Sequence, residues 1–264
     1  LNMWYDADID AKMRRTRGRP VPAGRVQGAD SLALGVVLSM FSVMLMGMAL
    51  NWLAAGLLAF TILFYAVVYT MWLKRWTAQN IVIGGLAGAL PPVIGWAAAS
   101  GTAPLNAWLL CAIIFFWTPP HFWALALLIK RDYEAARIPM LPVVRGDRET
   151  ARQIVWYSVV LVAVTLLPFA WQTVGVVYLA AALLLGAAFL RLAWRLRRIP
   201  LALELAAEGW TEMDSEPPSG ALAARALSQL GYLFEGIGHR RAALDMIRLA
   251  LHVAREAGHA TTLA

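Results

Sequence analysis

Residues 31–76 read SLALGVVLSMFSVMLMGMALNWLAAGLLAFTILFYAVVYTMWLKRW, and this stretch decides the fold. It contains two apolar runs, 31–50 and 53–73, which are separated only by Asn51 and Trp52. A helix needs roughly 20 apolar residues to cross the hydrocarbon core of a bilayer. Both runs are long enough, so the stretch predicts two successive membrane-spanning helices joined by a short turn.

Four more apolar runs follow, at 82–99, 106–129, 154–171 and 174–194. Across the chain, 60% of the residues are hydrophobic and 15% are charged, whereas about a quarter are charged in a typical soluble domain. The mean hydropathy is +0.61. We therefore expect an all-α fold, a polytopic membrane helical bundle with about six transmembrane helices.

The third run, VIGGLAGALPPVIGWAAA (82–99), carries two signals of helix geometry in membranes. Gly84 and Gly88 form a GxxxG pattern, which allows helices to approach closely. Pro91 and Pro92 interrupt the run, because proline lacks the amide proton that a helix interior requires. We expect close packing at the glycines and a break at the prolines, and a break beside a cavity would also suit a substrate pocket.

Lysine and arginine gather in alternate loops, and this bias orients the predicted bundle. The loops near 51, 102 and 172 carry no basic residue. The basic stretches are 12–25, 74–75, 130–152 and 191–198. By the positive-inside rule these stretches are cytoplasmic, so we expect a multi-pass protein of the cell inner (plasma) membrane. The membrane surface accounts for the net charge of +7, and no nucleic-acid partner is expected.

The character of the chain changes after residue 199. Residues 1–199 form the predicted membrane domain, and 200–220 are interpreted as a polar linker. Residues 221–264 have the spacing of one tetratricopeptide-like helical hairpin. We expect this hairpin to be soluble and cytoplasmic. Because one such repeat cannot bury its own core, its binding of a protein partner is a hypothesis.

The densest charged stretch is NMWYDADIDAKMRRTRGRP, residues 2–20. Asn2, Asp6 and Asp10 are spaced four apart, which places them on one face of a helix. Carboxylate and amide oxygens suit a hard cation such as Mg²⁺, which bridges one or two carboxylates to substrate phosphates. Asp8 points elsewhere and is expected to pair with an arginine or lysine. The alternative is an ordinary solvated loop of mixed charge.

A basic cluster follows these acidic residues within two helical turns. It includes Lys12, Arg15 and Arg19. One arginine guanidinium can donate two parallel hydrogen bonds to a phosphate group, so we expect the cluster to bind a diphosphate. Diphosphate departure requires cations that neutralise the developing charge.

The loop KRDYEAARIPMLPVVRG, residues 130–146, lies on the same predicted side of the membrane. Asp132 and Glu134 make it a candidate second half of a metal–diphosphate site, and an allylic chain would then lie in the apolar bundle. The alternative is an interfacial loop pinned by Pro139 and Pro142.

His121 lies inside the fourth run, about 12 Å below its cytoplasmic end at 1.5 Å per residue. An ionisable side chain at such depth is a functional candidate by default. We weigh two hypotheses: contact with iron or a polar substrate group, and a hydrogen-bonded histidine that serves only packing.

The stretch at 2–20 resembles the first aspartate-rich motif of the UbiA superfamily of intramembrane prenyltransferases, whose pattern is NxxxDxxxD. A longer pattern, DxDxxMxRTxxRP, is similar to the branch that farnesylates protoheme IX. Its residues here are Asp8, Asp10, Met13, Arg15, Thr16, Arg19 and Pro20. Three more blocks resemble that branch, and the resemblance covers about residues 1–195. They are TAQNIVIGGLAGALPPVIGWAA (77–98), WTPPHFWALAL (117–127) and RDYEAARIPMLPVVRG (131–146).

The resemblance implies a bundle of nine helices around a central cavity, of which our six runs would be helices three to eight. We accordingly expect a fragment, fusion or frameshifted chain that lacks the first two helices and the last. The implied reaction moves the farnesyl group of farnesyl diphosphate onto the 2-vinyl group of protoheme IX, with Mg²⁺ as cofactor and membrane lipid around the bundle. The implied site residues are Asn2, Asp6 and Asp10 for the metal, Asp6, Asp10 and Asp132 for catalysis, Lys12, Arg15, Arg19 and Lys130 for diphosphate, and His121 and Tyr133 for haem.

Three alternatives remain at this point. The first is a relative that prenylates a quinone precursor or chlorophyllide. Such enzymes carry a second DxxxD-like motif, whereas here Asp132 is followed four residues later by Ala136. The second alternative is a non-catalytic membrane scaffold. The third is a transporter, which we rank low because the acidic residues lie in loops rather than inside the apolar runs.

Overall fold

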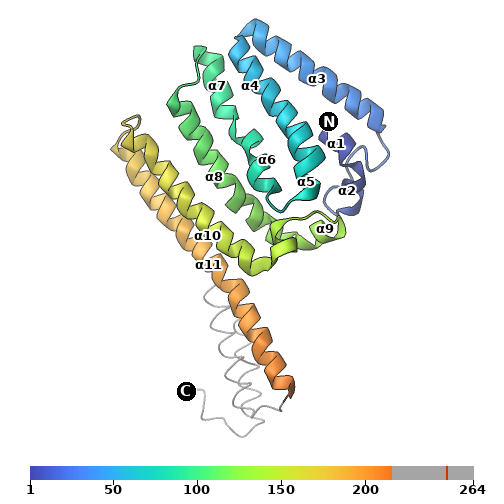
Figure 1. Ribbon diagram of the computed structural model, residues 1–264, viewed down its shortest axis with the longest axis vertical. Coiled ribbons are helices and arrows are strands. Elements are labelled where there is room, and N and C mark those ends of the chain that lie inside the picture. The colour runs from blue at the N-terminus through green and yellow to red at the C-terminus, as the bar shows by residue number, and fades with distance from the viewer. Residues whose placement is uncertain (216–247, 249–264) are drawn as a thin grey trace. The chain divides into compact units, whose positions relative to one another are not determined.

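The computed structural model describes residues 1–215 and Arg248, and every regular element in that part of the chain is a helix (Figure 1). The chain divides into two compact units, residues 1–190 and 191–264. The helices that could form a site all belong to the first unit, which is described below. The hairpin predicted at 221–264 lies outside the described residues.

Six helical stretches are long and apolar enough to cross a membrane, which confirms the predicted all-α bundle. The chain is a multi-pass membrane protein. The helices that make up these stretches are α3 (Gly28–Ala49), α4 (Trp52–Leu63) with the π-helix η1 (Phe64–Leu73) and α5 (Lys74–Trp76), α6 (Asn80–Ala89) with α7 (Pro91–Ser100), α8 (Leu105–Leu128), α10 (Leu141–Ala170) and the first half of α11 (Val176–Ser215). The predicted linker at 200–220 is therefore helical as far as Ser215, and the remainder of it is outside the described residues.

The fifth span begins earlier than its hydropathy predicts. The apolar run starts at 154, but α10 starts at Leu141 and is interrupted at Gly146, whose φ of 77° and ψ of 171° are not helical. The turn after Gly146 is polar and is held by side chains: Arg152 pairs with Glu149 at 2.8 Å, and the Gln153 amide donates to Glu149 at 2.8 Å. Pairs at this helical spacing stabilise a turn that burial does not, which is why an apolar pattern alone misses it.

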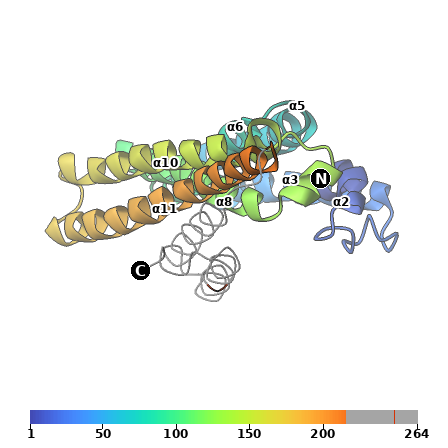
Figure 2. The ribbon, with the colours of Figure 1, turned by 90° about the horizontal axis from the view of Figure 1, so that it is seen from below.

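Spans that follow one another in the sequence lie side by side in the first unit (Figure 1). Helix α4 packs on α3 and α7, η1 packs on α6, and α8 packs on α6, α7 and α10. Figure 2 shows the first half of α11 beside α10. There the Tyr178 hydroxyl donates to the Thr165 carbonyl at 3.0 Å. Short connections explain this order, because successive helices then become antiparallel neighbours.

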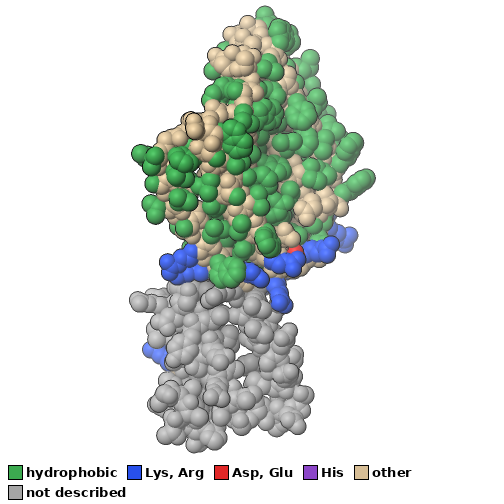
Figure 3. Space-filling view, turned by 60° about the vertical axis from the view of Figure 1, so that its left-hand side comes forward, with side chains coloured by type: hydrophobic (Ala, Val, Ile, Leu, Met, Phe, Trp, Pro, Cys, Tyr) green, Lys and Arg blue, Asp and Glu red, His purple; other side chains and the backbone are tan. Residues whose placement is uncertain are grey.

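The outer face of these spans is apolar, as a lipid-facing surface requires. On α3, Phe41, Met44 and Met48 are 62%, 50% and 76% exposed. Figure 3 shows one such face, on which hydrophobic side chains dominate and lysine and arginine gather at one end. A membrane solvates such side chains as well as a protein core does, so their exposure needs no soluble partner to explain it.

Three short helices gather at one end of the bundle (Figure 1). They are α1 (Asn2–Tyr5), α2 (Ala7–Lys12) and α9 (Lys130–Ala135). Helix α1 packs on α3 and η1. Beneath the three, a hydrophobic cluster joins residues from distant parts of the chain: Ile9, Met13, Ile81, Ala126, Tyr133, Ala136, Ile138 and Met140. This cluster holds the two charged loops of the sequence against the same end of the bundle.

Of the two glycines in the GxxxG pattern, only Gly84 makes a close approach. A Cβ atom at Gly84 would lie 2.1 Å from Cδ2 of Tyr69 on η1, whereas at Gly88 it would meet nothing within 4 Å. The predicted close packing is therefore confirmed at Gly84 and not at Gly88. The predicted helix break is confirmed as well, because α6 ends at Ala89 and α7 begins at Pro91.

The Gly84→Ala variant is expected to be less stable than the wild type. The added methyl group displaces the Tyr69 ring from a packed position, and overpacking of this kind costs about 1–3 kcal/mol. Unfolding in mixed micelles, followed by tryptophan fluorescence, measures the change. The matched control is Gly88→Ala, which fills open space and should leave stability equal or slightly higher. Equal loss in the two variants would contradict the assignment of close packing to Gly84.

Candidate active site

The first motif keeps its four-residue spacing although its helix is broken. Asp6 lies between α1 and α2 with φ −90° and ψ 10°. Its amide still donates to the Asn2 carbonyl at 2.9 Å, and the Asp10 amide donates to the Asp6 carbonyl at 2.8 Å. Asp6 and Asp10 are buried, at 0% and 3% exposure. Two carboxylates in such a position need partners, because an isolated buried charge is very costly.

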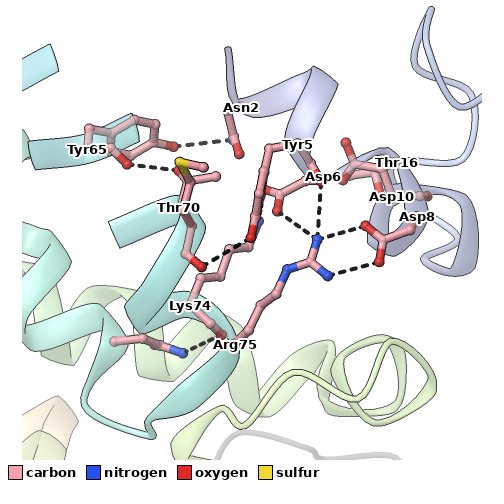
Figure 4. Close-up of polar contacts among 12 residues, drawn as sticks. Asn2, Tyr5, Asp6, Asp8, Asp10, Thr16, Tyr65, Thr70, Lys74 and Arg75 are labelled. Atoms are coloured by element: carbon pink, nitrogen blue, oxygen red, sulfur yellow. Dashed lines mark hydrogen bonds and ion pairs between the residues drawn. The ribbon is translucent and has the colours of Figure 1, made fainter. Parts of the chain in front are cut away.

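The partners of Asp6 come from the C-terminal end of the second span (Figure 4). The Lys74 ammonium donates to Asp6 Oδ2, and Arg75 Nη2 lies 3.7 Å from Asp6 Oδ1. Burial raises the pKa of the Asp6 carboxyl above its usual value, while Lys74 and Arg75 act to lower it. The ion pair therefore joins the first motif to a helix that lies 68 residues further along the chain.

Arg75 fixes the motif from its exposed side. Its guanidinium donates to both carboxylate oxygens of Asp8, at 2.9 and 2.7 Å, and to the Tyr5 carbonyl at 3.2 Å. It also lies over the Tyr5 ring, 4.9 Å from the centroid. Its hydrogen bonds hold the pKa of the Asp8 carboxyl below the usual value. This confirms that Asp8 pairs with a cation and does not face the cavity.

The partner of Asp10 comes from the turn that follows α2. Arg19 Nη1 donates to Asp10 Oδ2 at 2.8 Å. The buried Thr16 hydroxyl donates to the Asp10 carbonyl at 3.0 Å, which folds the turn back over the helix end. The RTxxRP part of the motif therefore has a local structural reason: Thr16 closes the turn, and Arg19 then reaches the carboxylate.

These residues border a cavity of about 370 Å³ that opens beneath the motif. Its mouth is polar and mostly cationic, and its interior is apolar and aromatic. The charged lining residues and the one amide are Asn2, Asp10, Arg15, Arg19 and Lys74. Larger apolar and aromatic residues of the lining are Tyr65, Tyr69, Ile114, Trp117, Phe122 and Met140. A ligand with an anionic head and an apolar chain would match both parts.

A second cavity of about 400 Å³ lies among α8, α10 and the first half of α11. Its lining is almost entirely apolar, and it shares Ile114 and Trp117 with the first cavity. The two side chains thus border both spaces, and an apolar chain longer than the first cavity has a neighbouring space to enter.

The structure brings most of the predicted first-motif residues to the cavity. Asn2, Asp10, Arg15 and Arg19 line it, and Asp6 is buried against Lys74, which lines it too. Lys12 is exposed and is not among the lining residues. Lys12 follows Asp10 by two residues on α2, and residues two apart do not share a face of a helix.

The second charged loop is divided between two surfaces. Tyr133 is buried and lines the cavity, whereas Asp132 and Lys130 line a neighbouring groove. Successive residues of a helix point in directions about 100° apart, and on α9 the cavity takes Tyr133 while the groove takes Asp132. Lys130 pairs with Asp147 at 2.8 Å. The predicted second carboxylate of the metal–diphosphate site is therefore not among the residues that line the cavity.

His121 lies outside the cavity. It is exposed on α8 and stacks on Trp117, with ring centroids 4.2 Å apart and planes 15° apart. The cavity-facing side of α8 is formed by Ile114, Trp117, Thr118 and Phe122. His121 thus reaches the cavity only through the Trp117 ring, and its predicted contact with haem gains no support from this placement.

Sequence reasoning missed two residues that complete the site, Lys74 and Arg75. In the sequence they form a short basic loop whose charge indicates only the orientation of the spans. The sequence does show a polar segment directly after them. In the structure the buried Asn80 amide of this segment donates to the Lys74 carbonyl at 3.3 Å and holds the turn between the two. The π-helix η1, which presents Tyr65 and Tyr69 to the cavity, had no sequence signal. Such helices are rare and often occur at functional sites.

Two buried oxygen atoms of the motif have no hydrogen-bond partner: Asn2 Oδ1 and Asp6 Oδ1. Buried oxygens that accept no hydrogen bond suit a hard cation. In the described part of the chain, no three or more His, Cys, Asp or Glu side chains come together as a metal site. The available ligands are thus two carboxylates and one amide, a small set that fits Mg²⁺ because this ion keeps several waters.

The profile of the UbiA prenyltransferase family matches residues 1–202. The chain therefore belongs to the UbiA prenyltransferase family. No solved structure matches the chain.

Similar proteins of known assignment share one name. The chain is 70% identical to the protoheme IX farnesyltransferase of Caulobacter vibrioides over 195 residues, which is 74% of this chain and 59% of that protein. It is 71% identical to the protein of that name from Caulobacter sp. strain K31 over 198 residues, 75% of this chain and 57% of the relative. The corresponding protein of Parvibaculum lavamentivorans is 60% identical over 198 residues, 75% of this chain and 62% of the relative. The chain thus spans about three-fifths of the length of these relatives.

The Lys74→Met variant is expected to lose about 3 kcal/mol of stability, because it leaves the buried Asp6 carboxylate without its closest cation. The double variant Asp6→Asn/Lys74→Met should lose at least about 1 kcal/mol less than the sum of the two single variants. Unfolding in mixed micelles measures all three. As a matched control, Arg152→Met removes an exposed pair and should cost at most about 1 kcal/mol. Strict additivity of Asp6→Asn and Lys74→Met would refute the coupling.

Proposed function

We propose that the chain carries the catalytic bundle of a protoheme IX farnesyltransferase. The reaction moves the farnesyl group of farnesyl diphosphate onto the 2-vinyl group of protoheme IX and yields haem O. One observation carries the proposal: buried carboxylates and three cations surround the mouth of an apolar cavity. The names of the similar proteins specify the donor and the acceptor.

The diphosphate of the donor would bind at the cavity mouth. Arg15, Arg19 and Lys74 line this mouth and present N–H donors to it. Asn2, Asp6 and Asp10 would hold Mg²⁺, which when bound would neutralise part of the charge on the leaving diphosphate. The buried oxygens of Asn2 and Asp6 that accept no hydrogen bond support this assignment.

The apolar interior would protect the reactive part of the donor. The carbon–oxygen bond to the diphosphate breaks, and its electron pair leaves with the diphosphate, which the cations at the mouth stabilise. The allylic cation that remains would lie among Tyr65, Tyr69 and Phe122, which line the interior, and aromatic rings attract a cation. The vinyl group of the acceptor forms the new carbon–carbon bond. Water then adds to the resulting porphyrin cation and releases a proton.

The location of the protein follows from the same charges. We place the chain in the cell inner membrane, with the motif loops and residues after α11 in the cytoplasm. The gathering of lysine and arginine at one end of the apolar surface (Figure 3) supports this orientation.

The proposed function is tested with membranes that contain the expressed chain, farnesyl diphosphate, Mg²⁺ and protoheme IX. We expect haem O to form, as detected by mass spectrometry of extracted haems. Asp10→Asn should lower kcat/KM by about a hundredfold or more, since it removes a charge that acts at the reacting diphosphate. The matched control, Asp30→Asn, changes an exposed carboxylate at the start of α3 and should have no effect.

The alternatives give different results in this experiment. A prenylated product from a labelled aromatic acid, without haem O, would assign the chain to the quinone-forming relatives. Absence of any prenylated product would favour a non-catalytic scaffold. Haem O formation that Asp10→Asn leaves undiminished would refute the role of the first motif.

A further inference from the structure

A groove of about 680 Å³ lies beside the cavity mouth. Apart from Arg15, its residues take no part in the proposed reaction. One side comes from the turn after α2, which contributes Arg14, Arg15 and Arg17. The other side comes from the junction of α8 and α9, where Lys130 and Arg131 face the same space. Two segments that are more than 100 residues apart in sequence therefore enclose one cationic concavity.

Most of this positive charge is uncompensated. Asp132 is the one carboxylate in the lining, and Lys130 is already paired with Asp147. Arg14, Arg17 and Arg131 are exposed and form no ion pair with any residue of 1–215 or with Arg248. Cations held close together without counter-charges favour the binding of an anionic ligand.

Apolar residues also line the groove. Residues 127–129 at the end of α8 line it, and Leu128 is 83% exposed. The positive-inside bias explains basic residues near a membrane surface, but it does not explain a concavity in which they surround an apolar strip. A ligand that matches both features has an apolar body and two or more anionic groups along one edge.

The groove meets the donor cavity. Arg15 lines both spaces, and α9 contributes Tyr133 to the cavity and Asp132 to the groove. A transfer between two substrates requires two sites that adjoin at the reacting atoms. Protoheme carries its two carboxylates on one edge of an apolar macrocycle and its two vinyl groups on the opposite edge. With the carboxylates on the outer arginines, the vinyl edge would face the cavity mouth.

We propose that this groove binds the two carboxylates of the porphyrin acceptor, with Arg14, Arg17 and Arg131 as the cations that select a dicarboxylate; the assignment rests on the proposed function. These arginines fix which edge of the acceptor approaches the donor. An anionic lipid headgroup offers similar chemistry, and the experiment below separates the two sources.

Binding of haem and of its dimethyl ester to the purified chain in nanodiscs of zwitterionic lipid tests the proposal. The wild type should bind the diacid about tenfold or more tightly than the ester, because charge-assisted hydrogen bonds to carboxylates are lost in the ester. Arg17→Gln/Arg131→Gln should reduce the affinity for the diacid to that for the ester and leave the ester unaffected. Arg152→Gln is the control. It removes one positive charge, as each of the other two substitutions does, but Arg152 lies on α10 outside the groove.

Two further measurements complete the test. Farnesyl diphosphate should bind the double variant as it binds the wild type, which reports an intact fold. Nanodiscs with anionic lipid should leave the preference of the wild type for the diacid unchanged. Equal affinity of the wild type for acid and ester, no haem binding, a preference that survives both substitutions, or its abolition by anionic lipid would each overturn the proposal. Absence of haem O formation with the acid preference intact would instead count against the proposed function alone.

Discussion

The ion pair between Asp6 and Lys74 is the interaction on which the site depends. A fully buried carboxylate is tolerated only if a cation accompanies it, and the nearest cations lie at the end of the second span. The pair therefore fixes the entry segment of the chain against a membrane helix. Arg75, which bridges Asp8 and the Tyr5 carbonyl, adds an orientation that a lysine could not give, since only a guanidinium binds a carboxylate in this paired manner.

The geometry of the cavity follows from this attachment. Lys74 directly follows η1, so the same helical segment that neutralises Asp6 also presents Tyr65 and Tyr69 to the interior. Helices η1 and α6 approach each other closely at Gly84, and both contribute residues to the wall of the cavity. Charge at the mouth and aromatic surface inside are thus consequences of one arrangement of helices.

The distribution of cations separates two tasks. Arg19 and Lys74 are bound to carboxylates of the first motif and line the cavity, whereas Arg14, Arg17 and Arg131 border the groove without such partners. Arg15 and the two neighbouring faces of α9 connect the spaces. The proposed donor and acceptor are both anionic, and two anionic ligands that bind side by side repel each other unless each has its own cations.

The sequence by itself determined the spans, because twenty apolar residues in a row have one stable arrangement in a bilayer, and it determined the first carboxylate face, because helical spacing is local. It also predicted that Asp8 pairs with a cation. Only the tertiary structure decided which cation serves which carboxylate, since the Asp6–Lys74 contact joins residues 68 apart. It also decided that Tyr133 faces the cavity while Asp132 does not, and that His121 lies outside. The direction of a side chain depends on how its helix is rotated against its neighbours, and packing sets that rotation.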